Sequence, residues 1–77
     1  TIFPNPASGS FRIHSASLTG SVRVSLSNIL GEILVLHSYE ATISGMQDIS
    51  LRNIPKGIYI VSVENGGTMY SEKLVVE

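Results

Sequence analysis

Apolar and polar residues alternate with a period of two along much of this chain. At residues 22–26, the apolar Val22, Val24 and Leu26 are separated by Arg23 and Ser25. Successive side chains of a β-strand point to opposite faces, so this pattern predicts a half-buried strand. The same alternation at residues 11–13 and 47–51 predicts two further strands.

The most strongly β-prone stretch, residues 57–63, follows a turn at "RNIPKG". This turn and its tyrosine resemble the corner before the sixth strand of immunoglobulin-like sandwiches, where a tyrosine hydroxyl bonds to nearby backbone. On that plan we expect Tyr59, Val61 and Val63 to face the core. Ile58 and Ile60 would then face outward.

Residues 32–39, "EILVLHSY", are instead a nearly continuous apolar run. Such a run is typical of a strand covered on both faces and predicts a central position in a sheet. We expect Leu34 and Leu36 to face inward.

Apolar residues would then gather on the outer face of the sheet. A contiguous exposed patch of this kind marks contact surfaces, so we expect a parent domain, a partner or a second copy of the chain, as a homodimer, to cover it. The candidate contact patch comprises Ile33, Val35, Ile58 and Ile60.

Turn signals separate the predicted strands at intervals of about 8–12 residues, and no stretch shows helical spacing. "NILG" and "NGG" are turns in which asparagine and glycine tolerate positive φ. A short strand is also expected around Thr42 and Ile43, and a last one in "TMYSEKLVVE". About seven short strands predict an all-β fold, an immunoglobulin-like antiparallel β-sandwich.

The first residues, "TIFPNPASGS", are rich in turn formers and cannot form a helix. We therefore divide the chain into an N-terminal segment at residues 1–9, expected to be a linker, and a β-sandwich domain at residues 10–77. Because the chain begins with Thr1 and shows no leader-like stretch, we expect it to be part of a longer protein.

Composition narrows the classes of function. The absence of cysteine excludes disulfides and thiolate metal sites. A net charge of −1, with 14% charged residues, offers no field that would attract nucleic acid. The longest apolar run is far too short to predict a transmembrane segment.

Candidate catalytic residues are few, namely His14, His37 and Asp48. Each histidine lies alone in a predicted strand, where a surface or packing role is more common than catalysis. The carboxylates are scattered without the spacing of a calcium loop, and no phosphate-binding glycine pattern occurs. We therefore predict a protein that is not an enzyme and needs no metal or cofactor.

Four segments, in order, resemble the C-terminal sorting domain of proteins exported by the type IX secretion system of certain Gram-negative bacteria. They are "FPNPASGSFRI", "VRVSLSNILGEIL", "ISLRNIPKGIYIVSVENGG" and "EKLVV". The resemblance covers nearly the whole chain, although many members end with a basic residue and this chain ends with Glu77. The family's motifs fall on Pro4, Asn5, Pro6, Gly31, Gly57, Tyr59, Lys73, Leu74, Val75 and Val76.

The resemblance implies a non-catalytic signal at the end of a secreted cargo protein. The cargo would pass through the periplasm, cross the outer membrane by the type IX translocon and reach the cell surface or the extracellular space. A surface sortase of the cysteine-peptidase type would then remove the domain. The expected partners are the translocon, the sortase and the upstream cargo domain.

A strand near the carboxyl end suits such a signal, because an edge strand offers unpaired backbone groups to an added strand of another protein. Lys73 would lie on its polar side, with Leu74 and Val76 anchored in the core. Gly57 and Tyr59 could equally serve only the turn and the corner hydrogen bond.

Two other functions stay open at this point. One is an extracellular carbohydrate-binding sandwich of a larger secreted enzyme, which usually displays a row of exposed aromatic residues. The chain has only two phenylalanines and three tyrosines, and no two of them are paired along one strand face. The other is a structural spacer, in which changes near the carboxyl end would alter stability alone.

Overall fold

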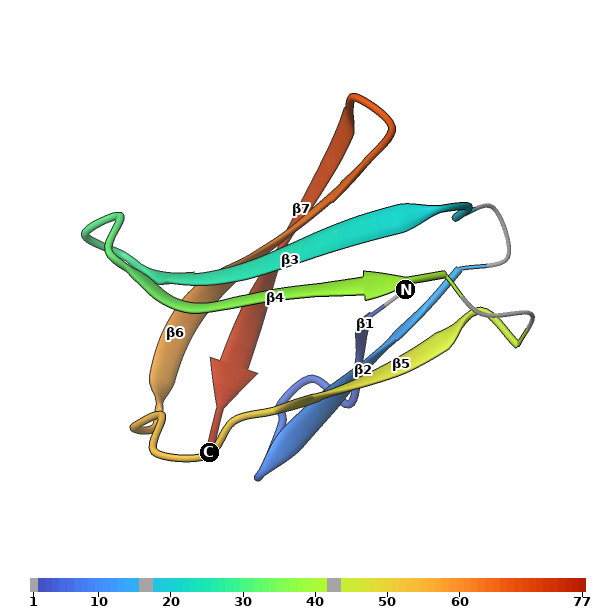
Figure 1. Cartoon of the computed structure of the whole chain (residues 1–77). Helices are drawn as coiled ribbons and strands as arrows, with labels where there is room; N and C mark the ends of the chain where they lie inside the picture. The colour runs from blue at the N-terminus through green and yellow to red at the C-terminus, as the bar shows by residue number, and fades with distance from the viewer. Residues whose placement is uncertain (1, 16–17, 42–43) are drawn as a thin grey trace.

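The computed structural model, described for residues 2–15, 18–41 and 44–77, is a sandwich of two antiparallel β-sheets (Figure 1). Its strands are β1 (Ile2–Phe3), β2 (Ser10–His14), β3 (Ser21–Asn28), β4 (Ile33–Glu40), β5 (Met46–Ser50), β6 (Gly57–Asn65) and β7 (Thr68–Val76). One sheet has the strand order β1-β2-β5 and the other the order β4-β3-β6-β7. The predicted all-β sandwich of about seven strands is confirmed. The strand expected around Thr42 and Ile43 lies outside the described residues.

The core fills the space between the sheets and is built from the alternating residues. On β3, Val22, Val24 and Leu26 are each 1% exposed. Val61 and Val63 of β6 lie beside Leu26 and Val24 in register, on the same face of the sheet. The alternation seen in the sequence therefore marks the inward face of both strands.

The orientation predicted for β6 is confirmed. The side chains that face the core are buried, namely Tyr59, Val61 and Val63. The alternate residues Ile58 and Ile60 are exposed. The buried hydrophobic residues are Ile2, Ala7, Phe11, Ile13, Val22, Val24, Leu26, Ile49, Leu51, Tyr59, Val61, Val63, Leu74 and Val76.

Strand β4 departs from the prediction. The expected central position is wrong, because β4 is an edge strand of the four-stranded sheet. A register shift at Leu26 and Ser27 places Val35 opposite Leu26 and Ile33 opposite Ser27. Leu34 is therefore an extra residue of the β-bulge type.

The faces predicted for β4 are wrong as well. Val35 packs against the core, whereas Leu34 and Leu36 are 43% and 63% exposed. An apolar run without alternation does not mark the inward face, and one inserted residue shifts which residues point inward.

The N-terminal segment is folded into the sandwich where the sequence predicts a linker. Ile2 and Phe3 form β1 and pair with Ile13 and Arg12 of β2. Ile2 and Ala7 are buried in the core. The prolines prevent a helix here, but they leave the apolar and small side chains free to pack.

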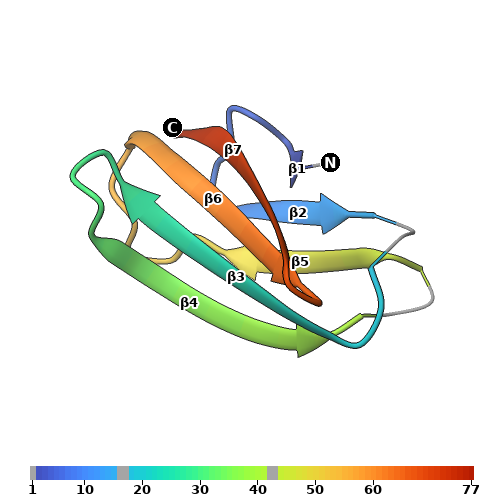
Figure 2. The same cartoon turned by 90° about the horizontal axis from the view of Figure 1, so that it is seen from above.

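The strands of the two sheets cross obliquely when the molecule is viewed from above (Figure 2). In the part of the chain that the structure describes, no helix has the length and apolar character needed to cross a membrane.

Candidate functional site

Strand β7 forms the second edge of the four-stranded sheet, and the N-terminal segment covers part of its free side. Ala7 forms a parallel bridge to Val76. The Ala7 N–H donates to the carbonyl oxygen of Val75 (2.7 Å), and the Glu77 N–H donates to that of Ala7 (2.8 Å). Because Ala7 is 0% exposed, packing as well as hydrogen bonding holds this segment against β7.

Asn5 extends the contact with its side chain. Its Nδ2 donates to the carbonyl oxygen of Lys73 (2.8 Å), and its Oδ1 accepts from the N–H of Val75 (3.0 Å). A parallel neighbouring strand would bond these two groups with one backbone N–H and one C=O. The Asn5 amide therefore takes the place of a peptide unit. The flanking Pro4 and Pro6 have no N–H to donate, so among residues 4–6 only Asn5 can donate to β7. We call Asn5 and Ala7 the latch.

Gly57 and Tyr59 begin β6 beside the latched end of β7. Gly57 pairs with Val76, and Tyr59 pairs with Leu74. The Tyr59 hydroxyl donates to the carbonyl oxygen of Pro55 (2.6 Å), which confirms the expected corner hydrogen bond. Gly57 has a φ of 157°, which other residues rarely adopt. Both residues thus have a structural role at this corner.

Gly31 lies in the turn between β3 and β4, which Asn28 organises. The Asn28 carbonyl accepts from the Gly31 N–H (3.0 Å). Its side-chain Oδ1 accepts from the N–H groups of Leu30 (2.9 Å) and Glu32 (3.0 Å). Since Asn28 pairs with Tyr59, this turn lies at the same end of the sheet as the corner.

The structure therefore places the predicted sorting residues at one end of the sandwich (Figure 1). Most of them lie around the carboxyl end of β7, whereas Gly31 lies in the β3–β4 turn, on the other side of the same sheet. Leu74 and Val76 are buried, as expected. Lys73 is exposed, and Val75 is half-buried on the outer face beside Ile58. Which of these residues a receptor contacts stays a prediction.

The other half of the free edge of β7 is open. The backbone groups of Val75 point toward the N-terminal segment, and backbone direction alternates along a strand. The N–H and C=O groups of Met69 and Ser71 and the N–H of Lys73 therefore point the same way. Among the described residues, none forms a hydrogen bond with these groups.

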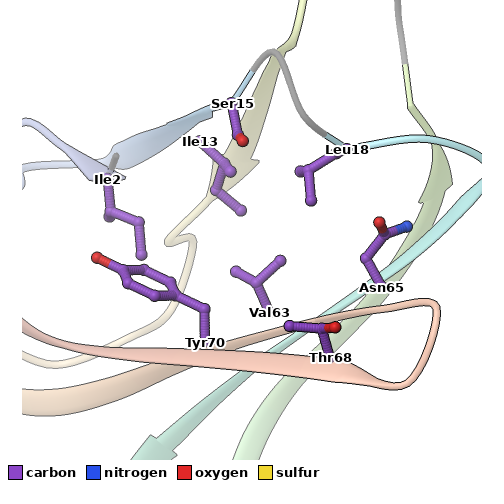
Figure 3. Close-up of a pocket in the computed structure, with 8 residues that line it drawn as sticks. All are labelled: Ile2, Ile13, Ser15, Leu18, Val63, Asn65, Thr68 and Tyr70. Atoms are coloured by element: carbon purple, nitrogen blue, oxygen red, sulfur yellow. The ribbon is translucent and has the colours of Figure 1, made fainter.

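A cavity of about 400 Å³ lies between the two sheets beside this open edge (Figure 3). Ile2 of β1 and Tyr70 of β7, which come from one edge strand of each sheet, face each other at one side of it. Ile13 and Val63 add apolar surface farther in. The remaining lining residues are Ser15, Leu18, Asn65 and Thr68.

The rim of the cavity carries a hydrogen-bonded pair. The Tyr70 hydroxyl donates to Oε1 of Glu72. This hydrogen bond, with smaller effects from burial and from the negative charge of Glu72, raises the pKa of Tyr70 above 10.0. Tyr70 is the donor of this pair, and the folded domain holds its phenolic proton more tightly than a free tyrosine does.

Exposed apolar side chains gather on the outer face of the four-stranded sheet. Ile33 and Ile60 flank Ser27 in register, and Leu36 replaces Val35 because Val35 packs inward. The corrected patch, which we call the outer patch, comprises Ile33, Leu36, Ile58 and Ile60.

The candidate catalytic residues lie on different elements. Asp48 forms an ion pair with Arg12 across β2 and β5, with Nε and Oδ1 2.6 Å apart. His37 is exposed on β4, its ring centroid 6.0 Å from that of Tyr39, and His14 ends β2. Within the described ranges, no three histidine or acidic side chains are placed to hold a metal ion.

Sequence reasoning missed two structural residues. Ala7 belongs to the latch, and a small residue in a proline-rich stretch gives no local sign of burial. Asn65 donates through Nδ2 to the carbonyl oxygens of Thr19 (2.6 Å) and Ser21 (2.8 Å). Its position before two glycines indicated only a turn.

The family of secretion system C-terminal sorting domains matches residues 1–77. A search of curated proteins finds no match. The family match includes the latch, the corner and the last strand, which meet at one end of the fold. The chain therefore belongs to the family of C-terminal sorting domains of the type IX secretion system.

Proposed function

We propose that this domain is the signal by which the type IX translocon selects a cargo protein for transport across the outer membrane. Membership of the sorting-domain family supports a signal that delivers its protein to the cell surface or beyond. The cargo lies upstream and reaches the translocon from the periplasm. The domain itself catalyses no reaction.

The observation that carries this proposal is the meeting of the family's motifs at one end of the fold. Asn5 bonds to Lys73 and Val75, and Tyr59 pairs with Leu74. A receptor would therefore bind a folded surface built from both ends of the chain. We propose that this surface runs along β7, from the motifs at its carboxyl end to the hairpin that joins β7 to β6 at its other end.

The carbohydrate-binding alternative receives no support from the aromatic residues. Phe11 and Tyr59 are buried, Phe3 and Tyr39 are half-buried, and only Tyr70 is exposed. A surface on which sugar rings stack would need several exposed aromatic side chains on one face.

The test is an export assay. A reporter enzyme with a periplasmic leader is joined upstream of Thr1 and expressed in cells that have the type IX system. We expect the reporter at the cell surface or in the medium, and in the periplasm of a matched strain without the translocon. The reporter without the domain is the control, and its equal export would contradict the proposal.

Deleting residues 73–77 would be a poor control, because it also removes Leu74 and Val76 from the core. Loss of export after that deletion would not separate a lost signal from a lost fold. Substitutions of exposed residues make the sharper comparison.

We further propose that a surface sortase removes the domain after export. Mass spectrometry of the exported reporter should then show a protein that lacks these 77 residues. An exported reporter that retains the domain would reject cleavage and leave the sorting function in place.

The outer patch is proposed to contact the cargo domain or a partner. Sedimentation of the isolated domain tests the remaining possibility, a homodimer formed through the patch. A dimer that Ile60→Ser converts to a monomer would support it, and a monomer at high concentration would reject it.

A further inference from the structure

We propose that the open half of the free edge of β7, from Met69 to Lys73, binds an extended segment of a secretion-system protein as an added β-strand. An apolar side chain of that segment enters the cavity next to Tyr70. The inference deepens the proposed function, on which it rests for the identity of the partner, by assigning the contact to one stretch of backbone.

The backbone of this stretch supports strand addition. The N–H groups of Ser71 and Lys73 and the C=O groups of Met69 and Ser71 point away from β6, and among the described residues they have no partner. An extended peptide presents donors and acceptors at the matching interval. A helix has already used these groups within its own turns, so an extended segment is the fitting ligand.

The chain itself already shows that this edge accepts a parallel segment. Ala7 pairs with Val76, and the Asn5 amide occupies the next position, opposite Leu74. The N-terminal segment then leaves β7 for the other sheet, where Ile2 and Phe3 form β1. The latch therefore ends where the open stretch begins, and an added strand would continue the same edge without displacing it.

The cavity supplies a site for one side chain of the added strand. Residues opposite each other in paired strands share a face, so the residue opposite Tyr70 would point between the sheets. There it would meet Ile2, Ile13 and Val63, in a cavity of about 400 Å³. Such a lining favours an aliphatic side chain (Figure 3).

The outer side of the edge favours a different residue. Lys73 is exposed on the outer face, and in the described part of the chain no carboxylate forms an ion pair with it. A residue of the added strand on this face would lie near Lys73, so an acidic side chain fits there. The preferred segment therefore alternates apolar and acidic residues.

Ser71 offers a matched pair of variants. Ser71→Pro removes the outward N–H and places the proline ring on the free side, where an edge strand tolerates it. Ser71→Ala keeps the N–H. Both lose the hydroxyl contact with Ser62 (3.1 Å), so their difference isolates the backbone group. Met69→Pro is a second variant for the case in which Ser71→Pro does not fold.

The probe is a short blocked peptide of alternating leucine and glutamate, titrated into the ¹⁵N-labelled domain. We expect saturable shifts at Ile2, Tyr70, Ser71 and Lys73, and slower amide exchange at Ser71 and Lys73. Ser71→Pro should weaken binding about tenfold or more, because it removes one hydrogen bond and obstructs the edge. Ser71→Ala should bind like the unaltered domain.

The control is a peptide of the same composition in which the leucines are adjacent and the glutamates are adjacent. Equal binding of this control, equal binding by folded Ser71→Pro or Met69→Pro, shifts confined to β4, or the absence of shifts would overturn the proposal. So would self-association of the domain through β7. If the peptide binds as expected but the reporter is not exported, the proposed function fails and strand addition stands. If the reporter is exported but the peptide does not bind, strand addition fails and the proposed function stands.

Discussion

At the residue scale, the function of Asn5 depends on partners far away in the sequence. Its side-chain amide bonds to residues 68 and 70 positions along the chain. In the sequence, an asparagine between two prolines indicates a turn, and no local pattern shows what it will contact. Tyr59 is the opposite case. Its hydroxyl bonds to a carbonyl only four positions away, so the corner could be predicted from the residues around it.

We expect Asn5→Ala to lower the free energy of unfolding by about 1–3 kcal/mol, because it removes two hydrogen bonds of about 0.5–1.5 kcal/mol each. Urea denaturation followed by circular dichroism measures this change. Ser8→Ala, an exposed position in the same segment, is the matched control and should have little effect. Equal stability of the two variants would show that the Asn5 amide does not hold β7.

Tyr70 provides a prediction about pH. The raised pKa of Tyr70 means that the folded domain holds the phenolic proton more tightly than the unfolded chain. The stabilisation is therefore complete below pH 10 and is lost as the pH rises through the folded pKa. Glu72→Ala, which removes the accepting carboxylate, should lower the pKa of Tyr70, measured by the ultraviolet absorbance of the phenolate. An unchanged titration would mean that the bond to Glu72 does not set this pKa.

At the element scale, the strands with clear alternation were predictable and β4 was not. The patterns of β3 and β6 mark their inward faces, since polar residues occupy the other face. In β4 both faces carry apolar residues, so the sequence contains no mark of the inward side. Its place at an edge and its extra residue Leu34 depend on the pairing with β3, which is a tertiary property.

A pair of substitutions tests the corrected faces of β4. Val35→Ser should lower the free energy of unfolding by about 1 kcal/mol or more, because Val35 packs against the core. Leu36→Ser should change it by less than about 0.5 kcal/mol, since this side chain is exposed. Thermal unfolding of the two variants measures the difference. The reverse order would restore the original assignment of the faces.

At the scale of the whole molecule, the two ends of the described chain meet along β7. The sequence predicted the sandwich and the family, because the strand patterns and the order of the motifs are local features. It did not predict that residues 2–9 take part in the fold, because the prolines indicated a linker. The contacts of Ala7 and Asn5 with the last strand appear only when the chain is folded.

This arrangement gives the two halves of the free edge of β7 different proposed roles. The latched half secures Leu74 and Val76 in the core, and the open half remains available to a partner. A partner that binds the open half would therefore recognise the complete, folded domain and not an unfolded chain. Export should depend on the open edge of β7 as well as on the stability of the domain.

The most direct test compares export of the same leader-bearing reporter joined to the Ser71→Pro and Ser71→Ala domains, in cells with the type IX system. Circular dichroism of both purified domains establishes that they are folded. We predict that the Ser71→Ala fusion reaches the cell surface and that the Ser71→Pro fusion accumulates in the periplasm. Equal export of the two fusions, with both domains folded, would contradict the claim that the open edge of β7 carries the signal.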